Sequence, residues 1–70
     1  MPDMIYVDSS NIEAVGYDGD SQELHIRYVG GACYVYHDVP RQVFDNLMNA
    51  PSKGSFMNRE VRNVYKFTKQ

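Results

Sequence analysis

The sequence lacks the residues that would cross-link a small domain or anchor it in a membrane. Its 70 residues include one cysteine, Cys33, and no tryptophan. A single cysteine forms no internal disulfide and no thiolate zinc site, a pattern that fits a reducing compartment. No apolar run is long enough for a signal peptide or for a membrane span of about 20 residues. We therefore expect one cytoplasmic domain over residues 1–70, with a small core and no membrane partner.

Basic residues are scarce in most of the chain and gather near its end. Residues 1–51 contain two basic and eight acidic residues, a net charge of −6, whereas residues 52–70 contain five basic residues and one acidic residue, a net charge of +4. Such a split often marks a surface for an anionic partner, although a solvated helix face has the same composition.

Residue sets that would support catalysis or metal binding are also missing. Cys33 and His37 lie four residues apart on one expected strand. At 3.3 Å per residue this is about 13 Å, too far for a thiolate–imidazole pair. His25 and His37 have no third ligand at a metal-binding spacing. We expect a protein that is not an enzyme and that needs no metal and no cofactor.

What the sequence does contain is a strong signal for a β-hairpin within residues 22–40. Apolar and polar residues alternate over residues 23–28, the period of a strand with one buried and one wet face. The returning run, residues 32–37, is rich in tyrosine and valine. Gly30 and Gly31 between the two runs can take the positive φ that tight hairpins require.

The register of this hairpin decides the role of Tyr34 and Tyr36, because a shift of one residue moves every side chain to the opposite face. With a two-residue loop, Arg27 lies opposite Tyr34, and the two rings form an exposed aromatic platform beside cationic groups. With a three-residue loop, a type I turn with Gly31 as the left-handed bulge residue, Ile26 lies opposite Tyr34 and both rings face the core.

Both registers are compatible with the residue pattern, and we favour the three-residue loop. That loop sets Glu23 opposite His37, which is a favourable cross-strand pair. It also keeps His37 away from the apolar face of the sheet. The aromatic platform stays as the alternative interpretation.

The residues before the hairpin are expected to extend the sheet. Residues 11–17 predict a strand, and the apolar residues Ile12 and Val15 have opposite parity, so we expect a bulge at or near Gly16. Residues 1–10 are expected to form an arm or a short edge strand.

Residues 18–21 are of types common in turns, so we expect them to connect this strand to the hairpin. A three-residue connection would place Glu13 opposite Arg27, a pair of opposite charges. The sheet predicted in this way is a three-stranded antiparallel meander.

After Pro40 the apolar residues recur at spacings of three and four, which predicts two C-terminal helices packed on one face of the sheet. The first begins at Pro40 and ends near Pro51, and Ser52 is expected to cap the second. The outer face of the second helix would carry three basic residues: Arg59, Arg62 and Lys66. Residues 67–70 are expected to fray. The predicted fold class is α+β.

Several short fragments follow one another in a distinctive order: Ser9-Ser10-x-Ile12, Val15-Gly16-Tyr17-Asp18, Leu24-x-Ile26-x-Tyr28, Gly31-x-x-Tyr34-x-Tyr36, Val39-Pro40 and Ser52-Lys53-Gly54-x-Phe56-x-Asn58. Together they resemble the KTSC domain, a small bacterial domain that is also found at the C-terminus of some lysyl-tRNA synthetases. The resemblance covers almost the whole chain and implies a central Tyr-x-Tyr motif, here Tyr34 and Tyr36. In the family the residue between the tyrosines is often polar. Here it is Val35, a departure that disfavours inward-facing tyrosines.

These observations favour a small non-enzymatic binding module that contacts RNA or another phosphate-bearing partner. RNA is suggested by the occurrence of the family in lysyl-tRNA synthetases. Unpaired bases would stack on Tyr34 and Tyr36, at roughly 1–3 kcal/mol per base, with Arg27 beside them. The phosphates would contact four basic residues: Lys53, Arg59, Arg62 and Lys66. The helix start at residues 52–55 could add one phosphate contact. The alternative is a protein–protein interaction module, or a homodimer, that pairs through an edge strand or through the N-terminal arm.

Overall fold

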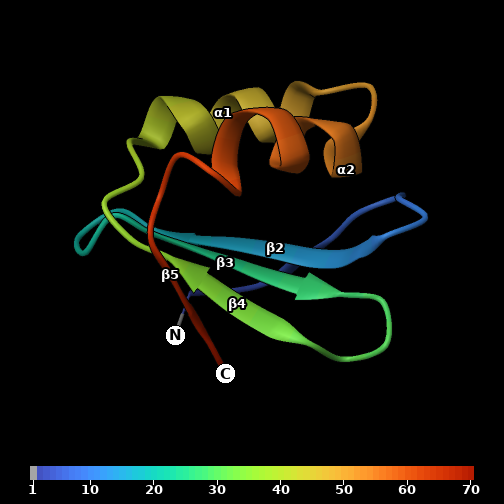
Figure 1. Ribbon diagram of the computed structural model, residues 1–70, viewed down its shortest axis with the longest axis horizontal. Coiled ribbons are helices and arrows are strands. Elements are labelled where there is room, and N and C mark those ends of the chain that lie inside the picture. Colours follow the sequence, from blue (N-terminus) through green and yellow to red (C-terminus); the bar gives the residue numbers. More distant parts are fainter. Residues whose placement is uncertain (1) are drawn as a thin grey trace.

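The computed structural model describes residues 2–70, which form one antiparallel sheet with helices over one of its faces (Figure 1). The strands lie in sequence order: β1 (Ile5–Tyr6), β2 (Ile12–Asp18), β3 (Glu23–Tyr28), β4 (Cys33–Tyr36) and β5 (Phe67–Lys69). The helical elements are α1 (Arg41–Asn49), α2 (Lys53–Phe56) and the π-helical turn η1 (Met57–Val61). The predicted α+β class and the two helices on one face are confirmed. The sheet has five strands, and the predicted three-stranded meander is its centre.

The two strands that the sequence did not reveal lie at the edges of the sheet. At one edge, β5 pairs with β4, so the prediction that residues 67–70 fray was wrong. Three residues are too few to show a strand period, but the free edge of β4 offers backbone partners, and the Gln70 N–H donates to the Cys33 carbonyl at 2.8 Å. At the other edge β1 pairs with β2, which agrees with the edge-strand alternative for residues 1–10, of which Met1 lies outside the described residues.

The bulge in β2 lies earlier than predicted. The register shifts between Ile12 and Ala14, whereas Gly16 pairs regularly with His25. An extra residue at this point turns the strand enough for Ile12 and Val15 to face the same core, and both are fully buried. The parity argument was therefore right about the presence of a bulge and wrong about its position.

The connection between β2 and β3 is one residue longer than predicted. It spans residues 19–22, and Gln22 takes a positive φ of 57°. The longer connection pairs Ala14 with Arg27 in place of Glu13. The side chains of Glu13 and Arg27 still meet, with an N–O distance of 3.4 Å.

The favoured register of the central hairpin is confirmed. Tyr34 lies opposite Ile26 and Tyr36 opposite Leu24, so both tyrosines share the face that the helices cover. The expected partner of Glu23 is also in place, because the Nδ1 atom of His37 lies 3.5 Å from its carboxylate.

The turn of this hairpin differs from the predicted type. The Tyr28 carbonyl accepts from the Gly31 N–H at 3.0 Å, so Gly30 is the third residue of the turn. Gly30 and Gly31 both have a φ of 101°. A positive φ at the third position is typical of a type II turn, not the predicted type I turn, and it requires glycine.

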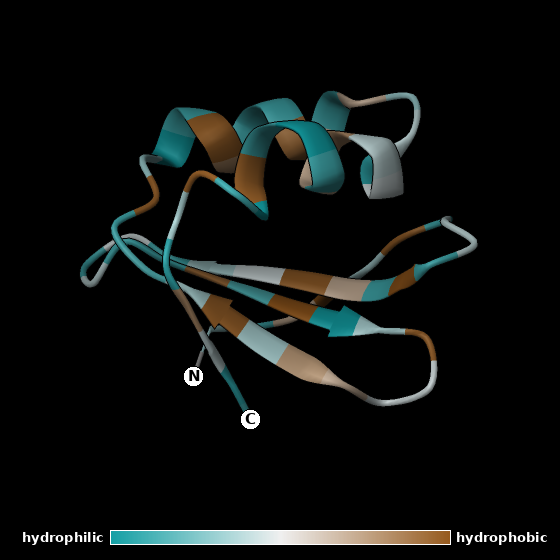
Figure 2. Cartoon of the chain, viewed as in Figure 1, coloured by the Kyte–Doolittle hydropathy of each residue, from teal (hydrophilic) through white to brown (hydrophobic). Residues whose placement is uncertain are grey.

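The hydrophobic core lies between the inner face of the sheet and the helices. Hydrophobic and hydrophilic residues alternate along the strands, as Figure 2 shows by colour. Leu24 and Ile26 from the sheet meet Leu47 of α1 and Val61 of η1, and all four are at most 1% exposed. No helix in residues 2–70 is both long enough and apolar enough to cross a membrane.

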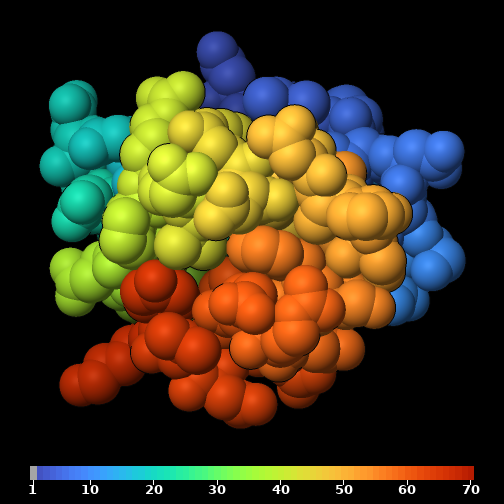
Figure 3. Space-filling model, turned by 90° about the horizontal axis from the view of Figure 1, so that it is seen from above, coloured from blue at the N-terminus to red at the C-terminus, as the bar shows by residue number. Residues whose placement is uncertain are grey.

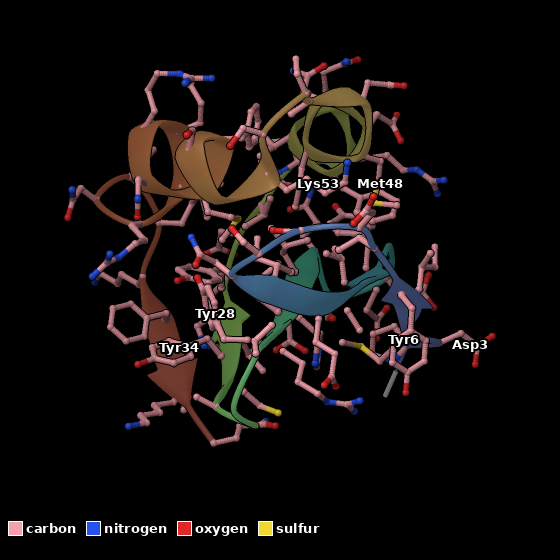
Figure 4. The ribbon with its side chains drawn as sticks, turned by 90° about the vertical axis from the view of Figure 1, so that its right-hand side faces the viewer. Asp3, Tyr6, Tyr28, Tyr34, Met48 and Lys53 are labelled. Carbon is pink, nitrogen blue, oxygen red and sulfur yellow. The ribbon has the colours of Figure 1, made fainter. Side chains whose placement is uncertain are left out.

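The outer face of the sheet is partly covered by residues 2–4. A Cβ atom built on Gly16 would lie 2.7 Å from the Met4 sulfur and 3.0 Å from the Asp3 carbonyl oxygen. Figure 4 shows Asp3 and Tyr6 on the opposite side of the sheet from Met48 and Lys53. The approach of this segment requires glycine at position 16. His25, the cross-strand partner of Gly16, is 7% exposed.

Candidate functional site

Aromatic rings from three strands gather on the inner face of the sheet. The Tyr34 ring lies 5.4 Å from the Tyr28 ring, nearly perpendicular to it at 86°, and 6.4 Å from the Tyr36 ring at 18°. The Phe67 ring is 5.3 Å from that of Tyr34. These are centroid distances of rings in contact. Figure 4 shows Tyr28 and Tyr34 side by side below the helices.

A pocket of about 540 Å³ opens between these rings and η1, and we call it the aromatic pocket. Its volume is within the range of about 300–1,000 Å³ that is typical of small-molecule sites. The sheet contributes Tyr28, Tyr34, Tyr36 and Phe67, the helical side contributes Gly54, Met57, Asn58, Arg62 and Asn63, and the loops contribute Asn11, Val29 and Ala32. One wall is therefore aromatic, and the facing wall carries amides and a guanidinium group.

The two tyrosines of the motif differ in what they offer to a ligand. Tyr36 is 2% exposed, and its hydroxyl is 3.4 Å from that of Tyr28. Burial, together with this hydrogen bond, raises the pKa of Tyr36, so its hydroxyl stays protonated at neutral pH. Tyr34 is half-buried. The exposed platform of two rings is therefore not formed, and of the two motif tyrosines only Tyr34 is partly exposed.

Arg62 is the predicted basic residue that reaches the aromatic pocket. The α-helical pattern gives way to a π turn, in which the Arg62 N–H donates to the Met57 carbonyl at 2.8 Å. The Arg62 Nη1 atom donates to the Asn58 side chain at 3.1 Å. Within residues 2–70 no carboxylate forms an ion pair with Arg62. Its charge is therefore available to an anionic ligand.

The other predicted phosphate contacts are dispersed. The helix ends at Val61, so Arg59, Arg62 and Lys66 do not form the continuous basic face that an uninterrupted helix would have given. The Arg59 Nε atom donates to the Glu60 carboxylate at 3.1 Å. Lys66 is exposed and lies between the helical segment and β5.

Two further predicted residues lie away from the aromatic pocket. Arg27 projects from the outer face of the sheet, because its neighbour Ile26 faces the core, and it pairs with Glu13. Lys53 donates from Nζ to the Ala50 carbonyl at 3.3 Å. It lines a second hollow, beside the aromatic pocket. Arg27 is thus separated by the sheet from the tyrosines that it was expected to accompany.

The second hollow, which we call the serine-rich hollow, has a volume of about 440 Å³. It is lined by residues 8–11, residues 51–55 and Asn58. The Ser52 side chain accepts from the Ser55 N–H at 3.4 Å, so Ser52 caps α2 as predicted. Sequence reasoning named residues 52–55 but missed residues 8–11. The one signal for them was the Ser9-Ser10 fragment of the resemblance.

The two cavities meet at three shared residues: Asn11, Gly54 and Asn58.

Viewed from the helical side, α1 and the segment from α2 to η1 cover the sheet side by side, with the C-terminal segment next to η1 (Figure 3). No group of three metal-ligating side chains occurs in residues 2–70. The side chains that line the two cavities can stack, hydrogen-bond and form ion pairs.

The sequence matches the family model of the KTSC domain over residues 8–65. The chain belongs to the KTSC domain family. The match includes Tyr34 and Arg62 of the aromatic pocket and all residues of the serine-rich hollow.

Relatives of this KTSC domain occur as small proteins and within larger enzymes. It is 52% identical to a protein of Tsukamurella paurometabola over 56 residues, 80% of this chain and 84% of that protein. It is 37% identical to a lysine–tRNA ligase of Nostoc punctiforme over 60 residues, which are 86% of this chain and 11% of the ligase. The crystal structure of a KTSC domain protein from Yersinia pestis has a TM-score of 0.93 and 32% identity, and the match covers 100% of this chain and 99% of that one.

Proposed function

We propose that this KTSC domain is a non-enzymatic binding module that holds an unpaired nucleotide of RNA in the aromatic pocket. One observation carries the proposal: the half-buried ring of Tyr34 and the guanidinium group of Arg62 line the same pocket. Unpaired bases stack on aromatic rings, and a nearby guanidinium attracts the phosphate of the same nucleotide.

The charges and amides around Tyr34 support a nucleotide over a purely apolar ligand. The Lys69 Nζ atom lies over the Tyr34 ring, 6.0 Å from its centroid, and Arg62 adds a second cation on the helical side of the pocket. Asn58 and Asn63 add amide groups that can hydrogen-bond to the edge of a base. Sequence reasoning missed Lys69, because residues 67–70 were expected to fray.

The relatives add a second line of support. The Nostoc punctiforme relative is named as a ligase of lysine and tRNA, and the region that matches this chain is a small part of it. A module that binds unpaired nucleotides of RNA would suit a protein that also contacts a tRNA. The affinity of such a module would depend on salt, because part of it comes from phosphate contacts.

An NMR titration with a mixed single-stranded RNA at low salt tests the proposal. We expect amide shifts to gather around the aromatic pocket. Arg62→Ala should weaken binding and reduce the slope of log affinity against log salt by about one unit. Arg41→Ala, an exposed arginine on α1, is the matched control and should leave that slope unchanged. The absence of any amide shift would refute RNA binding.

One observation favours protein pairing as a second candidate function. Tyr6 is 71% exposed and Ile5 is 46% exposed, and both belong to the edge strand β1. An apolar edge strand can pair with another chain. Sedimentation of the protein at low and high salt distinguishes this function. Salt-tolerant self-association that Tyr6→Lys abolishes and Arg62→Ala does not would support it.

A further inference from the structure

We infer that the serine-rich hollow binds the ribose of the nucleotide in the aromatic pocket, and that the domain thereby prefers RNA to DNA. This inference rests on the proposed function, because it needs a base in the aromatic pocket. It adds a specificity that the aromatic pocket cannot supply, since the faces of the bases are common to both nucleic acids. The 2′-hydroxyl is the group that distinguishes them.

The adjacency of the two cavities is the first argument. A base and its ribose are joined by a single glycosidic bond, so their sites must adjoin. The aromatic pocket and the serine-rich hollow share Asn11, Gly54 and Asn58. Gly54 contributes no side chain at this junction, and a Cβ atom there would lie 3.0 Å from the Asn11 side-chain nitrogen. Glycine at position 54 therefore lets the Asn11 side chain pack between the two cavities, which lie on either side of this contact.

The polar groups of the hollow are the second argument. Ser9, Ser10, Ser52 and Ser55 contribute hydroxyl groups, and Asp8 contributes a carboxylate. Hydroxyls both donate and accept, and an ionised carboxylate only accepts, so together they suit the neighbouring hydroxyls of a ribose. The Ser52 hydroxyl donates to that of Ser55 at 3.0 Å, which leaves the Ser55 hydrogen free to donate to a ligand.

Asp8 decides between a sugar and a phosphate in this hollow. It is exposed, and within residues 2–70 its carboxylate forms no ion pair and no side-chain hydrogen bond. A free carboxylate would repel a phosphate placed beside it, and Lys53, the cation among the residues that line the hollow, directs its Nζ atom to the Ala50 carbonyl. The Asp8 carboxylate would accept a hydrogen bond from the 2′-hydroxyl of a ribose. A hydrogen bond to a charged group is stronger than one between neutral groups. The phosphate is thus left to Arg62, at the aromatic pocket.

Two oligonucleotides that differ only at the 2′ position test this inference with the protein as it is. Fluorescently labelled hexamers of riboadenylate and deoxyriboadenylate have the same bases, and anisotropy titrations at one low salt concentration give both affinities. We expect the ribo hexamer to bind about tenfold more tightly, the ratio for one good hydrogen bond to a charged group. A 2′-O-methyl hexamer, which has lost that proton, should bind like DNA.

Asp8→Asn is the variant that should remove the preference, and Asp20→Asn is its control. Each substitution removes one negative charge from an exposed position. A general electrostatic effect would raise the affinity for both hexamers in both variants and would leave their ratio unchanged. We expect the ratio to fall toward one in Asp8→Asn, with no change in Asp20→Asn.

The outcomes separate this inference from the function on which it rests. If neither hexamer binds, the proposed function fails and the inference fails with it. If the wild-type domain binds both hexamers equally, the ribose contact is refuted and the base pocket stands. A ratio that Asp8→Asn leaves at about ten would also overturn the assignment of the hollow.

Discussion

Gly54 and Asn11 lie so close together that a Cβ atom on Gly54 would be 3.0 Å from the Asn11 side-chain nitrogen. Glycine in a helix ordinarily costs roughly 0.5–1 kcal/mol relative to alanine. Glycine in the first turn of α2 leaves space for the Asn11 side chain, which is exposed and lines both cavities.

Gly54→Ala should therefore separate binding from stability. The new methyl group would displace the Asn11 side chain, which lines both cavities, so we expect RNA affinity to fall several-fold. Thermal stability should stay the same or rise, because alanine favours the helix. Thermal melting and RNA titration of the same samples measure both effects. Gly19→Ala, in an open turn, is the control, and an unchanged RNA affinity in Gly54→Ala would contradict the role of the junction.

Gly16→Ala should release residues 2–4 from the outer face of the sheet. Its Cβ atom would lie 2.7 Å from the Met4 sulfur and 3.0 Å from a backbone oxygen, and the backbone cannot yield as easily as a side chain. We expect a loss of about 1–3 kcal/mol in the free energy of unfolding, the usual cost of overpacking. Urea unfolding measures it. Faster hydrogen exchange at the Val7 amide, which donates to Glu13, would locate the change.

The two tyrosines of the motif should respond differently to truncation. Tyr36→Ala removes a core ring and should cost about 3–5 kcal/mol of stability, as for other large aromatic residues, which leaves much of this small domain unfolded. Tyr34→Ala should leave a folded domain that has lost one stacking face, worth roughly 1–3 kcal/mol of RNA affinity. Circular dichroism and RNA titration distinguish the two. Equal loss of folding in both variants would show that Tyr34 is a core residue only.

Asp18 should make the stability of the domain sensitive to acid. Its carboxylate accepts the backbone N–H groups of Asp20 at 3.0 Å and Ser21 at 3.4 Å, which hold its pKa below the ordinary value of 3.8. A lowered pKa in the folded state stabilises the fold above pH 3.8, and this contribution is lost as the pH falls through the lower, folded value.

Asp18→Ala should therefore be less stable than the wild type at pH 6, and the difference should shrink below pH 3.8. Urea unfolding at a series of pH values measures this. Asp20→Ala, whose side chain accepts no such hydrogen bonds within residues 2–70, is the control and should follow the wild-type pH profile. A constant difference between Asp18→Ala and the wild type at every pH would contradict the assignment.

The centre of the fold could be predicted because its signals are local. Alternation identified β3, and the cross-strand pair of Glu23 with His37 selected the register that sets Tyr34 opposite Ile26. The edge strands could not be predicted in this way. β5 is three residues long, and what orders it is the exposed edge of β4, a feature of the assembled sheet and not of residues 67–70 themselves.

The candidate site was predicted in its parts but not in its arrangement. Tyr34 and Arg62 were both named from the sequence, yet as members of two separate surfaces. Bringing them together depends on the face of the sheet that carries Tyr34 and on where the helical segment ends, at Val61. Nothing in the local sequence signals the π turn, and without it the basic residues were expected to share one helical stripe.

The π turn at Met57–Val61 also sets the direction in which Arg62 points. Each residue of a regular helix advances the side-chain direction by about 100°. The π turn instead takes five residues to complete one turn, since the Arg62 N–H donates to the Met57 carbonyl. A KTSC sequence with one residue fewer here would close the same turn as a regular α-helix and keep its arginine directed at the pocket, whereas a regular helix of the present length would turn the guanidinium group away.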